Sequence, residues 1–275
     1  MKKIIITLFI VLMACVPVYA KSLKFVQVTD THLSIDGSGN GSRDVSKSVQ
    51  NLKNTVNTIN KMTDISFVVF SGDNIDSADE ESLHEFGKIT QALNVPYYLI
   101  LGNHDSYNMG GITKEDYFNI VKQYNKNQKN VRSYYYITPD SESVVILLDG
   151  ATEYIPSSHG YYPEEELAWL DNVLAKFKNK NAIIIQHFPY VEPVENKSHR
   201  IVDPELYFEV INKHKNIFAI FSGHYHCEKI TQQDGIYHVS SPALISDPAS
   251  FRVVEINYDK KPYELNTQIV PAVGQ

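Results

Sequence analysis

Short apolar runs alternate with amphipathic stretches along most of this chain. The runs are rich in β-branched residues and short enough to be buried strands of a parallel sheet. They lie at 23–29, 65–70, 97–101, 143–148, 181–186 and 217–221. Between them, apolar residues recur at steps of three and four, which predicts helices with one buried stripe. The clearest stripe comprises Val45, Val49, Leu52, Val56, Ile59 and Met62.

Three further helices are predicted. Apolar residues between Leu83 and Leu93 repeat the helical step, Pro163 precedes three glutamates, and Asp203-Pro204 precedes the segment ELYFEVI. The alternation of strands and helices predicts an α/β layered core. After about residue 236 the pattern indicates strands alone, so we expect a mixed sheet or a second sheet there.

Composition limits the class of protein without naming it. The chain has 275 residues, of which 43% are hydrophobic, and no repeat or Pro/Gly/Ser-rich linker divides it. We therefore expect a single domain over 21–275, large enough to bury a substantial core. The net charge of −7 argues against a nucleic-acid binder held by phosphate contacts, because such proteins carry a basic surface.

The first twenty residues predict a secretory signal peptide over 1–20. A basic pair at 2–3 precedes an apolar run at 4–14, and Val18-Tyr19-Ala20 offers a small-residue cleavage site. A spanning helix needs about 20 apolar residues, so this run is too short for one. We expect cleavage after Ala20 and a secreted or periplasmic protein.

The leader also allows a second interpretation. Leu12-Met13-Ala14-Cys15 resembles a bacterial lipobox, in which Cys15 would become a lipidated N-terminus and anchor the protein to the cell envelope. Cys15 and Cys227 are the only cysteines, so no internal disulfide can form once the leader is removed. Cys227 is interpreted as a small buried hydrophobe.

Polar side chains that can bind metals directly follow five of the predicted strands. They are Asp30, His32, Asp73, Asn103, His104, Asp105, His187, His224 and His226. In α/β sheets the carboxyl ends of the strands form the crevice where ligands bind, so we expect these side chains to meet there. The pair in SGHYHC has the spacing that would point both rings to one face of a strand, and a metal ion would explain that pair.

The type and number of these side chains predict the cofactor. Histidine nitrogens with carboxylate and amide oxygens suit Mn, Fe or Zn better than Ca or Mg, and a structural zinc site would use thiolates. Without His104 and Asp105, four histidines, two aspartates and one asparagine make seven candidate ligands, which is more than one ion usually takes. A carboxylate shared by two ions about 3.5–4 Å apart accounts for the excess, and that arrangement suits displacement at phosphorus.

The motifs that carry these residues follow a fixed order. They are D-T-H at 30–32, G-D at 72–73, G-N-H-D at 102–105, His187, and G-H-Y-H at 223–226. In this order they resemble the calcineurin-like metallophosphoesterases, and the resemblance extends over residues 23–245. It implies a four-layer α/β/β/α sandwich in which two mixed sheets are flanked by helices.

The resemblance also implies a role for each residue. One ion would be held by Asp30, His32 and His226, the other by Asn103, His187 and His224, with Asp73 bridging the two. A hydroxide held between the ions would attack phosphorus in line. His104 would face the leaving group as general acid or charge stabiliser, and Asp105 would orient its ring.

Other polar residues receive simpler interpretations. Asp76 is either support for Asp73 or a turn residue, and the sequence favours neither. The remaining histidines lie away from the strand ends, so we interpret them as surface or packing residues. They are His84, His159, His199, His214 and His238. For His159 and His199, which lie in loops, contact with the substrate is the alternative.

Departures from subfamily patterns narrow the substrate. The residue after Asp76 is serine where related protein phosphatases have arginine, and Asp76 stands where purple acid phosphatases have tyrosine. The chain more closely resembles small bacterial phosphodiesterases, including class III cyclic-nucleotide enzymes.

No arginine adjoins a metal-binding motif, and a monoester dianion is best held by extra positive charge. We therefore predict a phosphodiesterase acting on a small substrate. The alternatives are a secreted phosphomonoesterase and a non-catalytic binding protein on the same fold.

Overall fold

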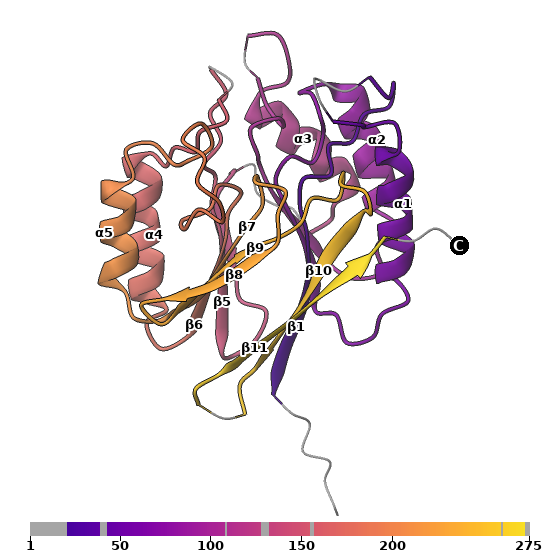
Figure 1. Ribbon diagram of the computed structural model, residues 1–275. Helices are drawn as coiled ribbons and strands as arrows, with labels where there is room; N and C mark the ends of the chain where they lie inside the picture. The colour runs from indigo at the N-terminus through magenta and orange to yellow at the C-terminus, as the bar shows by residue number, and fades with distance from the viewer. Residues whose placement is uncertain are drawn as a thin grey trace, which may run out of the picture.

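The computed structural model describes residues 21–272 apart from 39–42, 108, 128–131, 155–156 and 260. The predicted signal peptide and Cys15 therefore lie outside the described residues. Two mixed sheets stand face to face, with helices covering the outer face of each (Figure 1). The predicted four-layer α/β/β/α sandwich is confirmed.

The first sheet has the strand order β11-β10-β1-β2-β3. Its central strands β1, β2 and β3 are parallel, and β10 and β11 extend it antiparallel from β1. The bounds are β1 (Ser22–Val28), β2 (Phe67–Ser71), β3 (Tyr97–Ile100), β10 (Ser250–Asn257) and β11 (Glu264–Pro271).

The second sheet has the strand order β4-β5-β6-β7-β9-β8. Strands β5, β6, β7 and β9 are parallel, and β4 and β8 pair antiparallel at its two edges. The bounds are β4 (Tyr135–Ile137), β5 (Ser143–Leu147), β6 (Asn181–Ile185), β7 (Ile217–Ser222), β8 (Lys229–Gln233) and β9 (Ile236–Ser240). The strand-rich C-terminal region thus contributes to both sheets.

Three helices cover the first sheet and two cover the second (Figure 1). They are α1 (Ser48–Ile59), α2 (Glu80–Thr90), α3 (Lys114–Tyr124), α4 (Glu164–Lys176) and α5 (Glu205–Lys213). The sequence analysis did not predict α3, although Thr113 and Asp116 form a capping box at its start. Among the described residues, no helix combines the length and apolar character needed to cross a membrane.

Alternation along the strands sorts their side chains into two cores. In β1, Phe25 packs between the sheets against Phe67 and Phe221, whereas Val26 joins the core under the helices. Strands buried on both faces explain the near-continuous apolar runs in the sequence. Because the two sheets face each other, the carboxyl ends of β1, β2 and β3 lie beside those of β6 and β7.

Candidate metal centre

Five strands deliver the predicted ligands to one edge of the molecule. Asp30 follows β1, Asp73 follows β2, Asn103 follows β3, and His187 follows β6. The G-H-Y-H motif follows β7. Hydrogen bonds between these loops fix their positions, since His224 N donates to Asp30 Oδ2 at 3.0 Å across the two sheets.

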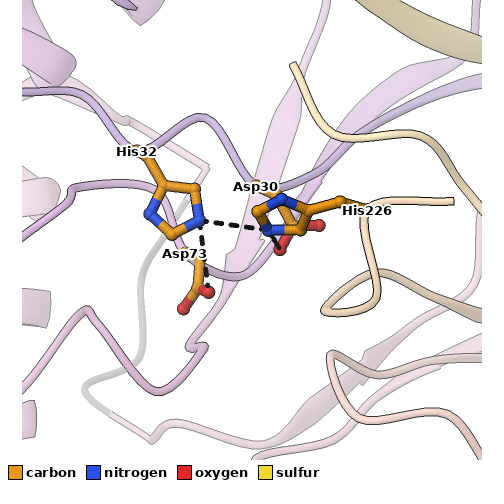
Figure 2. A group of neighbouring side chains, drawn as sticks. All are labelled: Asp30, His32, Asp73 and His226. Carbon is orange, nitrogen blue, oxygen red and sulfur yellow. Dashed lines mark hydrogen bonds and ion pairs between the residues drawn. The ribbon is translucent and has the colours of Figure 1, made fainter. Parts of the chain in front are cut away.

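The first group of side chains comprises Asp30, His32, Asp73 and His226 (Figure 2). His32 Nε2 and His226 Nε2 face each other at 3.3 Å. His226 Nε2 lies 3.2 Å from Asp30 Oδ1, and His32 Nε2 lies 3.6 Å from Asp73 Oδ2. Two imidazole nitrogens and two carboxylates aimed at one point form a donor set that fits a transition-metal ion.

The second group comprises Asp73, His187 and His224, whose ligand atoms lie within 4.8 Å of one another. His187 Nε2 is 3.2 Å from Asp73 Oδ2. Asn103 belongs beside this group, because the next residue, His104, donates its backbone N–H to Asp73 Oδ1 at 3.0 Å. Asn103 Oδ1 is buried and makes no hydrogen bond with any described residue, as expected of an atom that binds an ion. Asp73 is the carboxylate common to both groups.

Carbonyl groups around the centre hold two of the imidazoles in one tautomer. His187 Nδ1 donates to Ser71 O at 2.9 Å, so Nε2 is the nitrogen that faces Asp73 and would bind an ion. His224 Nε2 donates to Ser158 O at 2.8 Å, so Nδ1 is the nitrogen left for an ion. Such outer contacts orient metal-binding histidines. Ser71 and Ser158 act through backbone atoms, which the sequence could not reveal.

The backbone at this edge is strained. Asp30, His32, Asp73, His224 and His226 all have positive φ, between 44° and 71°. Residues other than glycine adopt this region rarely and at a cost of about 1–3 kcal/mol each. Five such residues in one centre indicate that the surrounding structure holds these side chains in place for a function.

Glycines next to the ligands allow the loops to approach closely. A Cβ at Gly223 would lie 2.0 Å from Thr29 Oγ1 and 2.5 Å from Asp30 Oδ2. Gly72 has φ of +95°, and a Cβ there would lie 2.5 Å from His187 Nδ1. The glycine before the histidine pair therefore permits close contact between loops of the two sheets.

Burial and opposite charges set the protonation of the centre. Burial alone would raise the pKa of Asp73, but the charges of His187, His104 and His32 and the contact with His187 together outweigh burial, so the pKa lies well below its usual value. Burial would lower the pKa of His187, but Asp73 raises it to about 9. Burial lowers the pKa of His224 to about 3. The carboxylates are thus ionised and stabilised by positive charge, which a bound cation would also provide.

The His104 ring lies beside this centre but is oriented differently from the prediction. Its Nδ1 is 2.7 Å from the backbone oxygen of Asp76. Asp105 instead accepts hydrogen bonds from the backbone amides of Asn74, Ile75 and Gly102, at 2.8, 3.1 and 2.8 Å. The predicted orientation of His104 by Asp105 is therefore wrong, because the Asp105 side chain points back to hold the G-D and G-N-H-D loops together.

Asp76 contacts His32 rather than Asp73. Its Oδ1 lies 3.1 Å from His32 Nδ1 and 3.3 Å from Arg43 Nε. The same arginine reaches the predicted acid, with Arg43 Nη2 3.2 Å from His104 Nε2. No arginine adjoins a metal-binding motif in the sequence. In the structure, however, Arg43 lies beside His104 of the G-N-H-D motif. It comes from a Gly/Ser-rich loop that carries no signal of its own.

The remaining histidines take varied places. His84 contacts Tyr124, His214 pairs with Asp171, and His238 is buried against Tyr190, as packing residues do. His199 lies beside the centre, with its ring 5.0 Å from that of His224, as the alternative interpretation of its loop allowed. His159 contacts the Lys197 carbonyl in a neighbouring loop.

Comparison with known proteins gives a consistent result. A family model for calcineurin-like phosphoesterases matches residues 23–228. A probable glycerophosphodiester phosphodiesterase, GpdQ, from Arcobacter nitrofigilis is 28% identical over 208 residues, covering 73% of this chain and 71% of that protein. A probable cyclic nucleotide phosphodiesterase from Fibrobacter succinogenes is 25% identical over 237 residues, covering 83% of each.

A solved structure supports the fold. A dimetal phosphatase from Danio rerio superposes with a TM-score of 0.73 at 17% identity, covering 91% of this chain and 96% of that one. At this identity the likeness concerns the fold alone. The side-chain geometry of the two ligand groups comes from the present structure.

Proposed function

This chain belongs to the calcineurin-like phosphoesterase family, and on that premise we propose that it is a two-metal phosphodiesterase. The observation that carries the proposal is the position of Asp73, which belongs to both groups of ligand atoms. A shared carboxylate is what two adjacent ions require, and paired ions serve displacement at phosphorus. The relatives named as phosphodiesterases support the choice of a diester.

The ligand sets follow from the geometry and the resemblance together. Asp30, His32 and His226 would hold one ion, Asn103, His187 and His224 the other, and Asp73 both. The four imidazoles favour Mn, Fe or Zn. When bound, the ions would offset negative charge on the phosphoryl oxygens and make a water molecule acidic enough to attack phosphorus.

His104 is placed to act on the leaving oxygen. Its Nδ1–H donates to the Asp76 carbonyl, so Nε2 faces outward and is the atom that would transfer a proton. Arg43 Nη2 lies 3.2 Å from this nitrogen, so one substrate oxygen could accept hydrogen bonds from both groups. The arginine would hold that oxygen while the imidazole protonates it.

A cavity of about 530 Å³ opens beside His104 and offers room for the leaving alcohol. Its lining includes Asp76, Asp79 and the hydroxyls of Ser77, Ser106 and Tyr107, with no lysine or arginine. Ser106 Oγ is buried and has no hydrogen-bond partner among the described residues. A cavity of this chemistry suits an uncharged, hydrogen-bonding alcohol better than a phosphorylated one.

Arg43 does not reverse the choice of a diester. Its guanidinium is already paired with Asp76 at 3.3 Å, so it adds little net positive charge. Arg200, the other arginine in a nearby loop, has its Nε 3.6 Å from Glu192 Oε1. A monoester carries one more negative charge than a diester and needs a cation that is not already balanced.

The test compares two esters with the same leaving group. The chain loaded with Mn²⁺ should give a higher kcat/KM for bis-nitrophenyl phosphate than for nitrophenyl phosphate near neutral pH. A monoester rate about tenfold above the diester rate would replace the proposal with a secreted phosphomonoesterase. Two bound ions without turnover of either ester would favour a binding protein on this fold.

A further inference from the structure

Two loops form a wall beside the second group of ligands. They comprise residues 157–160 and 196–201. Ser158 Oγ donates to the Ser198 carbonyl at 2.5 Å, and a parallel β-bridge joins Gly160 to the second loop. Together the two loops make one surface, which we call the loop wall.

Hydrogen bonds attach both loops of this wall to the motif that supplies His224. The Ser158 carbonyl accepts the bond from His224 Nε2 at 2.8 Å. Tyr225 OH donates to the Asn196 carbonyl at 3.4 Å. Each loop is thus held in position relative to the ligands of the second ion, as outer contacts of a metal centre are.

His199 lies on the loop wall at the edge of the metal centre. Its ring centroid is 5.0 Å from that of His224 and 5.8 Å from that of Tyr225. Its Nδ1 lies 2.9 Å from Ser198 Oγ, and the side chain is half-buried. Part of the imidazole is therefore accessible to a molecule bound at the centre. Neither the ligand sets nor the proton transfer to the leaving group uses this ring.

His104 and His199 flank different ligand groups. The His104 ring is 4.7 Å from the ring of His32 in the first group, whereas the His199 ring lies beside His224 in the second. A diester has four oxygens on phosphorus, of which two would contact the ions and the leaving oxygen would face His104. The fourth oxygen carries the alcohol that stays on phosphorus. Because the loop wall lies beside the group that the His104 ring does not flank, it is the surface that this retained alcohol would meet.

From this geometry we propose that His199 is a specificity-determining residue that contacts the retained alcohol of the diester and favours an aromatic one. The inference rests on the proposed diesterase activity, because a monoester has no retained alcohol. The half-buried rings of His199 and Tyr225 stand together at this edge, and aromatic groups are stabilised by rings whose centroids lie about 4.5–7 Å away. An aliphatic alcohol cannot make that contact.

The experiment compares two diesters that share a nitrophenyl leaving group and differ in the retained alcohol. They are phenyl nitrophenyl phosphate and methyl nitrophenyl phosphate, and the chain is loaded with Mn²⁺. The unmodified chain should prefer the phenyl ester in kcat/KM, and His199→Ala should lower that preference about threefold to tenfold. His199→Phe, which keeps a ring, should restore it. Metal content should be the same in all three proteins, because His199 belongs to neither ligand group.

His159→Ala is the matched control. His159 belongs to the same wall, but its Nε2 lies 3.2 Å from the Lys197 carbonyl and its Nδ1 lies 3.2 Å from Ser157 Oγ. This variant should keep the phenyl preference of the unmodified chain. An equal loss of preference in both variants would overturn the inference in favour of a structural role for the wall.

Turnover by the unmodified chain separates this inference from the proposed function. Turnover of neither diester, with two ions bound, would overturn the proposed function and this inference with it. Turnover of both diesters, with a preference that His199→Ala leaves unchanged, would overturn this inference alone.

Discussion

The charged side chains at the carboxyl ends of the parallel strands are buried, whereas those at the amino ends are mostly exposed. At the carboxyl ends, Asp30, His32 and His187 are fully buried, and Asp73 is almost so. At the amino ends of β6 and β7, a basic cavity of about 600 Å³ is lined by lysines that are exposed or half-buried: Lys178, Lys180, Lys213, Lys215 and Lys261. Burial removes charged groups from water at a cost of several kcal/mol each, so the first group depends on compensating charge in the molecule or on bound ions. The exposed lysines stay solvated, so their charges need no such compensation.

The backbone shows the same contrast. The metal centre contains five residues with positive φ, whereas none of the five lysines of the basic cavity has one. Strain persists where the surrounding structure fixes it, and at the carboxyl edge hydrogen bonds between loops do so. The metal centre, where several ligands must be placed together, is thus also where the backbone is strained.

Replacing the shared carboxylate should produce the largest effect. Asp73→Asn removes the charge common to both ligand groups, so metal content should fall and diester turnover should drop about 10³-fold or more. Metal analysis and single-turnover kinetics measure the two results. Asp234→Asn is the matched control, since Asp234 has φ of 53° against 52° for Asp73 but lies in the exposed β8–β9 turn. Full activity with two ions in Asp73→Asn would remove the basis of the centre.

The predicted acid should matter next, and only for some substrates. His104→Ala should keep both ions and lose about 10²–10⁴-fold in kcat for a diester with a poor leaving group. The loss should shrink for a nitrophenyl ester, whose leaving group departs without a proton. Equal losses for both esters would assign His104 to charge stabilisation or positioning.

Substitutions of residues that contact a metal ligand, without binding an ion themselves, should have smaller effects. Asp76→Asn weakens the charged contact with His32 Nδ1 at 3.1 Å, and metal affinity should fall about 10–100-fold. Arg43→Gln removes the other partner of Asp76, and it should lower kcat/KM without a comparable loss of metal affinity. Calorimetric titration with Mn²⁺ separates the two outcomes. Equal loss of metal affinity in both variants would mean that Asp76 and Arg43 act as one unit.

A buried histidine outside the centre should give the smallest effect, on stability alone. Burial lowers the pKa of His238 to about 4, below its unfolded value of about 6.5. The stability that the neutral His238 ring contributes is therefore complete above pH 6.5 and is lost as pH falls towards 4. Urea unfolding of His238→Phe should show a shallower loss of stability over that range than the unmodified chain. Identical pH profiles would contradict the shift.

The pattern of the sequence predicted most of the fold. Strand runs and helical stripes depend on local periodicity, which the chain displays directly, and the ordered motifs located the candidate ligands at strand ends. The helix α3 was missed although it buries Tyr117, Phe118, Ile120 and Val121, because its capping box has Asp116 where the usual sequence signature has Glu or Gln. Val45 was predicted to begin the first helix, whereas α1 begins at Ser48, because helix ends are set by local contacts that the apolar stripe does not encode.

The sequence by itself thus determined which residues could bind metal and which strands would carry them. Only the tertiary structure decided the contacts between segments: Arg43 beside His104, Asp76 on His32, and Asp105 turned towards backbone amides. It also brought Lys21 into an ion pair with Glu142, which lines the basic cavity. Such contacts depend on the direction in which side chains point across two packed sheets. They also depend on backbone carbonyls, which every residue has, so the sequence does not show which carbonyl makes the contact. Periodicity in the sequence determines the secondary structure of a segment, whereas the packing of the two sheets determines which residues that segment contacts.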